Sequence, residues 1–308
     1  MARYVARRIL QMLPVIIGTT FLIFMMVWAL PGDPFAGRCG QRPCSDAFIQ
    51  AETARLHLDQ SLPVQYGYFL WNMLQGDFGT VSNGDTVLHQ MTRAFPITMK
   101  LTSVAIAFEV ILGIGIGIIA ALQRGKAFDR ATLLISLVAI SFPVFVIGFV
   151  IQYVFGVRLG FFPVTVGSGA PWSDLIMPGF VLATLSLAFV LRLTRASLLE
   201  TLNADHVRTA VAKGLPRSMV IRRHIVRNSL IPVFTYIGAD VGVLLGGAIV
   251  TEGIFNIQGV GGLLFTATRL RENATVVSVT TVVVLIVLFV NLLIDLFYAV
   301  LDPRIRYE

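Results

Sequence analysis

Six long apolar stretches, separated by polar connections, restrict the fold of this 308-residue chain more than any other feature. A helix needs about 20 apolar residues to cross roughly 30 Å of hydrocarbon. The stretches lie near residues 9–30, 101–122, 131–157, 178–191, 231–252 and 275–301. The fourth is short, but its helix can continue through residues 192–202 into the aqueous phase. Because a bilayer offers bare backbone groups no hydrogen-bond partner, we expect an all-α integral membrane protein with six transmembrane helices.

Composition excludes the other broad classes. Only 13% of the residues are charged and 56% are hydrophobic, whereas a soluble domain carries about 25% charged residues. That polar surface is too small for a water-soluble globule, and the apolar content excludes a disordered chain. A net charge of +7 is also typical of nucleic-acid binding. We exclude that function because the basic residues lie between apolar blocks and not along one soluble face. We therefore expect residues 1–308 to form a single transmembrane domain.

The distribution of lysine and arginine predicts the orientation in the membrane. With the N-terminus in the cytoplasm, the inner connections hold twice as many of these residues as the outer ones, in a shorter total length. The positive-inside rule therefore places both termini in the cytoplasm. The first apolar run is longer than the 7–15-residue core of a signal peptide, so we expect a retained anchor.

The longest outer connection, residues 31–97, contains two further features. An apolar face at helical spacing in residues 59–74 predicts an amphipathic segment at the membrane surface, and it comprises Leu62, Tyr66, Phe69, Leu70 and Met73. Cys39 and Cys44 are the only cysteines of the chain. Their location outside the cytoplasm permits a disulfide, and two reduced thiols are the alternative.

Glu109 and Asp240 are ionisable residues near the middle of their predicted spans. Because a charge in hydrocarbon costs several kcal/mol (roughly 2.5–3.5 on insertion scales), such groups are functional candidates. They line a polar translocation pathway or make structural hydrogen bonds between helices; the sequence leaves both readings open.

Small residues and a proline also mark the spans. We expect the two G-x-x-x-G pairs, Gly113 with Gly117 and Gly242 with Gly246, to let helices approach closely. Pro143 predicts a kink in the third span.

Motifs for catalysis and for metal binding are missing from the sequence. It contains no Walker A motif, no H-E-x-x-H motif and no Cys/His cluster. We therefore expect a chain that is not an enzyme and that binds no metal or other cofactor itself.

The largest inner connection, residues 192–230, carries the most informative pattern. Val207, Ala210, Val211 and Gly214 share one face of a short helix, which predicts a smooth ridge that fits a protein groove. Gly214 and the following proline should end this helix, and a basic helix over residues 217–227 should return to the membrane. An ordinary basic loop with surface helices is the alternative interpretation.

This stretch resembles the EAA loop in the membrane subunits of bacterial binding-protein-dependent ABC importers. The segments D205-H-V-R-T-A-V-A-K-G-L-P216 and R223-H-I-V-R-N-S-L-I-P232 are similar to the peptide/nickel permease branch. Arg208 and Thr209 occupy the Glu and first Ala positions of the general motif, and Arg227 replaces its later proline. Further similar segments are L30-P-G-D-P34, L58-D-Q-S-L-P-V-Q-Y66, G246-G-A-I-V-T-E-G-I-F-N-I-Q-G-V-G261 and D295-L-F-Y-A-V-L-D-P-R-I-R306.

The resemblance implies a type I ABC importer (MetI-like) permease in the bacterial cytoplasmic membrane. It implies a homologous second permease, two cytoplasmic ABC ATPase domains that hold ATP and Mg, and an extracytoplasmic substrate-binding protein. The residues expected to dock on the ATPases and couple their motion to the spans are Ala204, Asp205, Val207, Arg208, Thr209, Ala210, Val211, Lys213, Gly214 and Leu215.

On the outer side, a glycine-rich connection is a candidate gate or contact for the binding protein. Its candidate residues are Glu252, Phe255, Gly259 and Gly261; a plain surface connection is the alternative. The expected cargo is a dipeptide or oligopeptide. Nickel or other small cargo is an alternative within the same branch, and a proton-coupled secondary transporter or a membrane enzyme is the alternative from another class.

Overall fold

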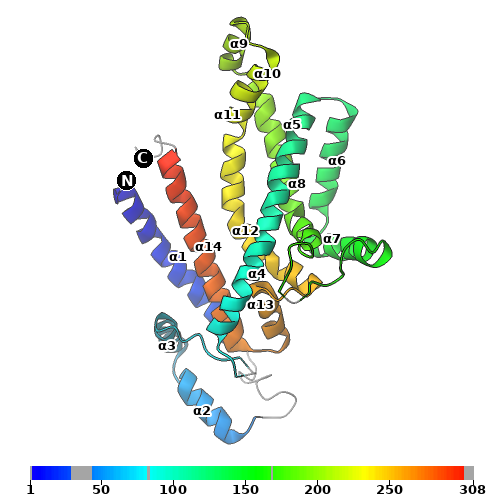
Figure 1. Ribbon diagram of the computed structural model, residues 1–308. Coiled ribbons are helices and arrows are strands. Elements are labelled where there is room, and N and C mark those ends of the chain that lie inside the picture. Colours follow the sequence, from blue (N-terminus) through cyan, green and yellow to red (C-terminus); the bar gives the residue numbers. More distant parts are fainter. Residues whose placement is uncertain (1, 29–43, 82–83, 168, 302–308) are drawn as a thin grey trace. The chain divides into compact units, whose positions relative to one another are not determined.

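The computed structural model describes residues 2–28, 44–81, 84–167 and 169–301. Over these ranges the regular structure is helical, apart from an isolated bridge between Thr80 and Thr86. The chain divides into two compact units (Figure 1): Met1–Thr98 with Asn256–Glu308 forms unit 1, and Met99–Phe255 forms unit 2. The residues expected to couple this chain to the ATPases all lie in unit 2.

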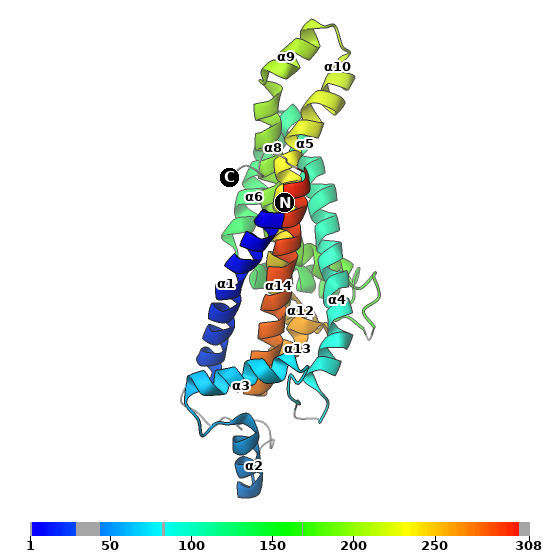
Figure 2. The same ribbon diagram turned by 90° about the vertical axis from the view of Figure 1, so that its left-hand side faces the viewer.

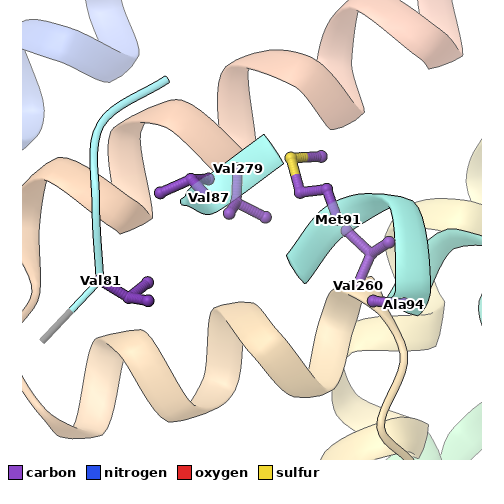
Figure 3. Packing of buried hydrophobic residues seen from close by; sticks show 6 residues of the cluster. All are labelled: Val81, Val87, Met91, Ala94, Val260 and Val279. Atoms are coloured by element: carbon purple, nitrogen blue, oxygen red, sulfur yellow. The ribbon is translucent and has the colours of Figure 1, made fainter. Parts of the chain in front are cut away.

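Unit 1 contains the two ends of the chain. Its helices are α1 (Ala2–Trp28), α2 (Asp46–Leu56), α3 (Leu62–Leu74), the first part of α4 (Val87–Phe108), α13 (Val260–Arg269) and α14 (Asn273–Leu301). Helix α1 packs along α14, and α3 lies across their end (Figure 2). A second core joins α4, α13 and α14 (Figure 3), through Val81, Val87, Met91, Ala94, Val260 and Val279.

The amphipathic segment predicted in the outer connection forms helix α3, and its predicted apolar face packs within the chain. Tyr66 is buried, and together with Leu62, Phe69 and Leu70 it packs in a core with Phe24 of α1. The hydroxyl group of Tyr66 also lies 2.7 Å from that of Thr20. The opposite side of α3 is apolar as well and exposes Val64, Tyr68, Trp71 and Leu74. The helix is confirmed, and its position at the membrane surface stays a prediction.

Unit 2 is built around α8 (Ile176–Leu202). It also contains the end of α4, η1 (Glu109–Ile114), α5 (Gly115–Leu122), α6 (Ala127–Ser141), α7 (Val144–Ile151), η2 (Gln152–Arg158), α9 (Asp205–Ala212), α10 (Arg217–Met219), η3 (Val220–Val226), α11 (Arg227–Ser229) and α12 (Ile231–Phe255). The segments labelled η are π-helices. Helix α8 contacts η1, α5, α6, α7 and α12, so most of the unit packs on this one helix.

Within the described residues, five helices are long and apolar enough to cross a membrane. They are Ile9–Trp28, Val87–Leu122, Ile176–Leu202, Arg217–Gly246 and Asn273–Ile294. Two further pairs, α6 with α7–η2 and the end of α12 with α13, qualify only when the two members are taken together. Helix α8 extends to Leu202, which confirms that the fourth span continues beyond its apolar part. The second span begins at Val87, 14 residues before the apolar stretch that predicted it.

The third predicted span is broken near Pro143. Helix α6 ends at Ser141, α7 begins at Val144, and the two axes differ by 107°. Phe142 adopts extended backbone angles, as expected for a residue before proline, and Pro143 has no N–H group with which to continue the helix. The sequence predicted a kink here; the structure has a complete break.

Candidate functional site

Helix α9 and the segment that follows it form the tip of unit 2 (Figures 1 and 2). Helix α8 ends at Leu202, and Ala204 caps the N-terminus of α9 with extended backbone angles. The chain then turns back through α10, η3 and α11 into α12. The residues expected to couple to the ATPases, which run from Ala204 to Leu215, therefore lie along this one helix and at its two ends.

A Schellman motif ends α9. The Leu215 N–H donates to the Ala210 carbonyl (3.4 Å), and the Gly214 N–H donates to the Val211 carbonyl (2.9 Å). Gly214 has φ of +73°, a left-handed conformation in which glycine has no steric penalty. This confirms the prediction that the helix ends at Gly214, and it gives the physical reason for a glycine at this position.

The apolar ridge predicted for α9 is divided between two environments. Val207 (5% exposed) and Ala210 (4%) are buried in a core with Leu198 of α8 and with Val220 and Ile225 of η3. Val211, by contrast, is 60% exposed. Val207 and Ala210 therefore hold α9 on its own hairpin and are not available to a partner in this conformation. Docking of these two residues on an ATPase stays a prediction, and in this conformation the exposed members of the ridge are Val211 and Gly214.

Polar contacts fix the same hairpin. The ring nitrogen Nε2 of His206 lies 3.3 Å from the carbonyl of His224 and 3.2 Å from Nδ2 of Asn228. Nearer the bundle, the Ser197 hydroxyl donates to the carbonyl of the buried Ser229 (2.8 Å). No local sequence pattern marks these residues, because each contact joins positions 18 or more apart in the chain.

The exposed side of α9 carries the remaining coupling candidates. Exposed residues of the set are Asp205, Arg208, Thr209, Val211, Lys213 and Gly214. Asp205 and Arg208 form a weak ion pair (3.7 Å) in which both side chains are largely exposed. This side therefore combines one large apolar side chain with polar and charged groups, as protein contact surfaces commonly do.

Helix α8 connects the hairpin to several spans. Arg195 makes a double ion pair with the buried Asp129 of α6, with N–O distances of 2.5 and 2.9 Å. On another side of α8, a Cβ atom added to Gly117 of α5 would lie 2.7 Å from Cβ of Thr194 and 2.8 Å from the Leu191 carbonyl oxygen. This close approach is the helix packing predicted for the Gly113–Gly117 pair. Helix α8 therefore packs against α5, α6 and α12 as well as against the hairpin that carries α9.

The pathway candidates Glu109 and Asp240 lie inside unit 2. Glu109 is fully buried at the start of η1, and Asp240 of α12 is 4% exposed and accepts a hydrogen bond from Tyr236 (3.4 Å). Both carboxylate oxygens of Glu109 and Oδ2 of Asp240 have no hydrogen-bond partner among the described residues. Neither residue faces a surface of the isolated chain in this conformation, so the assignment to a translocation pathway stays a prediction.

The outer gate candidates are buried within the chain. Glu252 and Phe255 belong to the end of α12, while Gly259 and Gly261 flank the start of α13. The N–H of Val260 donates to the buried Thr98 hydroxyl (2.8 Å). The expected flexible loop is therefore mostly helix, and the role of these residues in a gate stays a prediction. Of the possible disulfide, Cys39 lies outside the described residues.

The described residues thus form a helical protein with several apolar helices long enough to cross a membrane and one exposed helix, α9, at the tip of unit 2. The chain belongs to the family of binding-protein-dependent transport system inner membrane components: the model of that family matches residues 113–307, and a second model, for the N-terminal part of such components, matches residues 1–102. It is therefore a multi-pass inner-membrane permease subunit of an ABC importer, in the peptide/nickel branch.

Relatives in this branch match over the full length of both chains. The dipeptide transport system permease protein DppB of Alkalihalophilus pseudofirmus is 34% identical over 334 residues. The glutathione transport system permease proteins GsiC of Pectobacterium atrosepticum and of Escherichia coli K12 are 38% and 37% identical, over 309 and 310 residues. Membership in this family implies ATPase and substrate-binding partners.

Proposed function

We propose that this chain translocates dipeptides or oligopeptides across the cytoplasmic membrane. The relatives that carry this proposal are permeases named for dipeptide and for glutathione transport, and they match the whole chain. Nickel cargo has less support, because no group of three or more metal-ligating side chains occurs among the described residues. In this proposal the chain is not an enzyme, and ATP and Mg are bound by the partner subunits.

The proposed complex contains a homologous second permease, two cytoplasmic ATPase domains and an extracytoplasmic binding protein. Both termini and α9 lie in the cytoplasm, as the lysine and arginine distribution predicts. The exposed side of α9 docks on an ATPase. ATP binding draws the ATPases together, α9 transmits this motion through α8, and the cavity opens toward the binding protein; hydrolysis resets it. ATP and cargo can each shift the equilibrium between the open and the reset state only to the extent that they bind one state more tightly than the other.

The observation that supports docking at α9 is the exposure of Val211 on a helix that the chain's own core holds in place. Because Val211 makes no core contact, Val211→Asp should leave the fold intact while placing a charge in the docking contact. Val211→Ala is the matched control, since it shortens the side chain without adding charge. In the reconstituted four-component complex, we expect Val211→Asp to lower substrate-stimulated ATPase activity and uptake at least tenfold.

Normal activity of the Val211→Asp complex would contradict docking through this side of α9. Cargo is tested separately, by uptake of labelled dipeptide, oligopeptide, glutathione and Ni²⁺ into vesicles that contain the complex. Uptake of Ni²⁺ alone would contradict the peptide proposal. Uptake by the permease chain without ATPases, driven by a proton gradient, would support the secondary-transporter alternative.

A further inference from the structure

The return segment of the hairpin exposes three arginines on one face. Arg222 and Arg223 belong to η3, and Arg227 follows directly. A π-helix bonds residues five positions apart, so such residues lie near one another along its surface. Burial follows the same spacing: Val220 and Ile225 are buried on one face, while Arg222 and Arg227 are exposed on the other. The π-helix thus separates an apolar face that carries α9 from an arginine face.

No acidic side chain balances this arginine face. Asp205 is the only acidic residue between positions 201 and 230, against six lysines and arginines, and its ion pair is with Arg208. Arg222, Arg223 and Arg227 make no ion pair within the described part of the chain. These exposed guanidinium groups are therefore available to an anion from outside the chain.

The position of the arginines relative to the membrane span indicates which anion is within reach. Helix α12 begins at Ile231, and a helix rises about 1.5 Å per residue. Arg227 thus lies about 6 Å before the apolar span, and Arg223 and Arg222 lie farther from it along the hairpin. The headgroup layer of a bilayer is roughly 5–8 Å thick on each side. Arg227 lies within this layer, and the long side chains of the other two extend toward it.

We propose that Arg222, Arg223 and Arg227 bind the phosphate of an anionic phospholipid in the cytoplasmic leaflet. Guanidinium groups match phosphate oxygens with paired hydrogen bonds, which a zwitterionic headgroup satisfies less well because its own ammonium competes. The bound lipid stabilises the hairpin whose other face holds Val207 and Ala210 of α9. Membrane composition thereby affects the element that we propose couples ATP hydrolysis to transport. The orientation assumed here rests on the proposed function.

The test measures lipid binding to the full-length chain in detergent, by native mass spectrometry. The probes are phosphatidylglycerol, phosphatidylcholine and inorganic phosphate. The variants are R222Q, R223Q and R227Q, singly and together. A matched control removes three exposed arginines of the predicted outer connections, with R93Q, R158Q and R271Q. Thermal unfolding of each variant verifies that the fold is retained, and the single variants serve if the triple variant does not fold.

We expect the chain to retain phosphatidylglycerol in preference to phosphatidylcholine. Each arginine removed should weaken this binding about fivefold, so the triple variant should lose on the order of 100-fold, while the outer control should bind as the unaltered chain does. Unchanged binding by the triple variant would overturn the proposal, and so would equal binding of inorganic phosphate. The triple variant could also bind lipid normally but no longer copurify with the ATPases. That result would overturn the lipid proposal and indicate that the arginines bind an acidic protein surface.

Failure of this proposal is distinguishable from failure of the docking proposal. Lipid binding is measured on the chain alone, whereas the Val211→Asp experiment measures activity of the complex. Selective phosphatidylglycerol binding therefore supports the arginine site even if Val211→Asp has no effect.

Discussion

Two glycines of α5 allow the close packing of α5 against α8 to be measured with a built-in control. A Cβ atom added to Gly117 would lie 2.8 Å from the backbone carbonyl oxygen of Leu191, which cannot move without displacing α8. A Cβ atom added to Gly115 would have no neighbouring heavy atom of another helix or side chain within 4 Å. Both residues lie within α5, so the gain in helix propensity from Gly to Ala, about 1 kcal/mol, is the same at both sites.

The two substitutions should have different effects on stability. Gly115→Ala should stabilise the chain by about 1 kcal/mol. Gly117→Ala gains the same propensity but incurs an overpacking cost of about 1–3 kcal/mol, so it should be about 1–3 kcal/mol less stable than Gly115→Ala. At roughly 2–4 °C per kcal/mol, the two melting temperatures should differ by about 2–12 °C.

The assay is thermal unfolding of the two purified variants in the same detergent at the same heating rate. Equal melting temperatures would refute the conclusion that α5 and α8 are in contact at Gly117. A variant in which both substitutions are combined should show additive changes, since Gly115 makes no contact that Gly117 shares.

Other predictions concern the ion pair, the buried carboxylate and the cysteines. Arg195→Gln should lower the unfolding free energy by about 2–3 kcal/mol, because the Asp129 carboxylate remains buried without its charged partner, and Asp129→Asn should cost less because Arg195 is partly exposed. A double-mutant cycle should show coupling, and additive losses would contradict the pairing. Asp240→Asn should lower uptake without loss of thermal stability, because it removes the acidic group and keeps an oxygen that can accept from Tyr236; normal uptake with a lower melting temperature would favour structural packing. Cys39 and Cys44 should resist alkylation until a reductant is added; labelling without reductant would show reduced thiols.

The ends of a membrane span could be predicted where they coincide with the ends of an apolar stretch. Helix α4 shows the limit: it begins at Val87, but its first turns contain His89, Arg93 and Lys100, so no apolar window marks them. The end of α9 could be predicted because Gly214 adopts the left-handed conformation that ends a helix, and Pro216, two residues later, cannot continue one. Signals of this kind lie within a few residues of the feature they determine.

The burial of individual faces could not be predicted in the same way. Val207 and Val211 are four residues apart on α9, yet only Val207 contacts the core of the hairpin. Helix α3 poses the same difficulty, because both of its sides are apolar and only the position of α1 decides which one is buried. The ion pair of Arg195 with Asp129 joins residues 66 positions apart. Such features depend on tertiary packing, which local sequence patterns do not contain.

The most direct test of the account is photo-crosslinking from position 211 in the intact complex. A photoreactive amino acid replaces Val211, and a second complex carries it at Trp172, an exposed residue of the predicted outer connection. The account predicts an ATP-dependent crosslink from position 211 to an ATPase subunit and none from position 172. No crosslink from position 211 to an ATPase, or labelling of that position by a reagent confined to the outside of the membrane, would contradict the account.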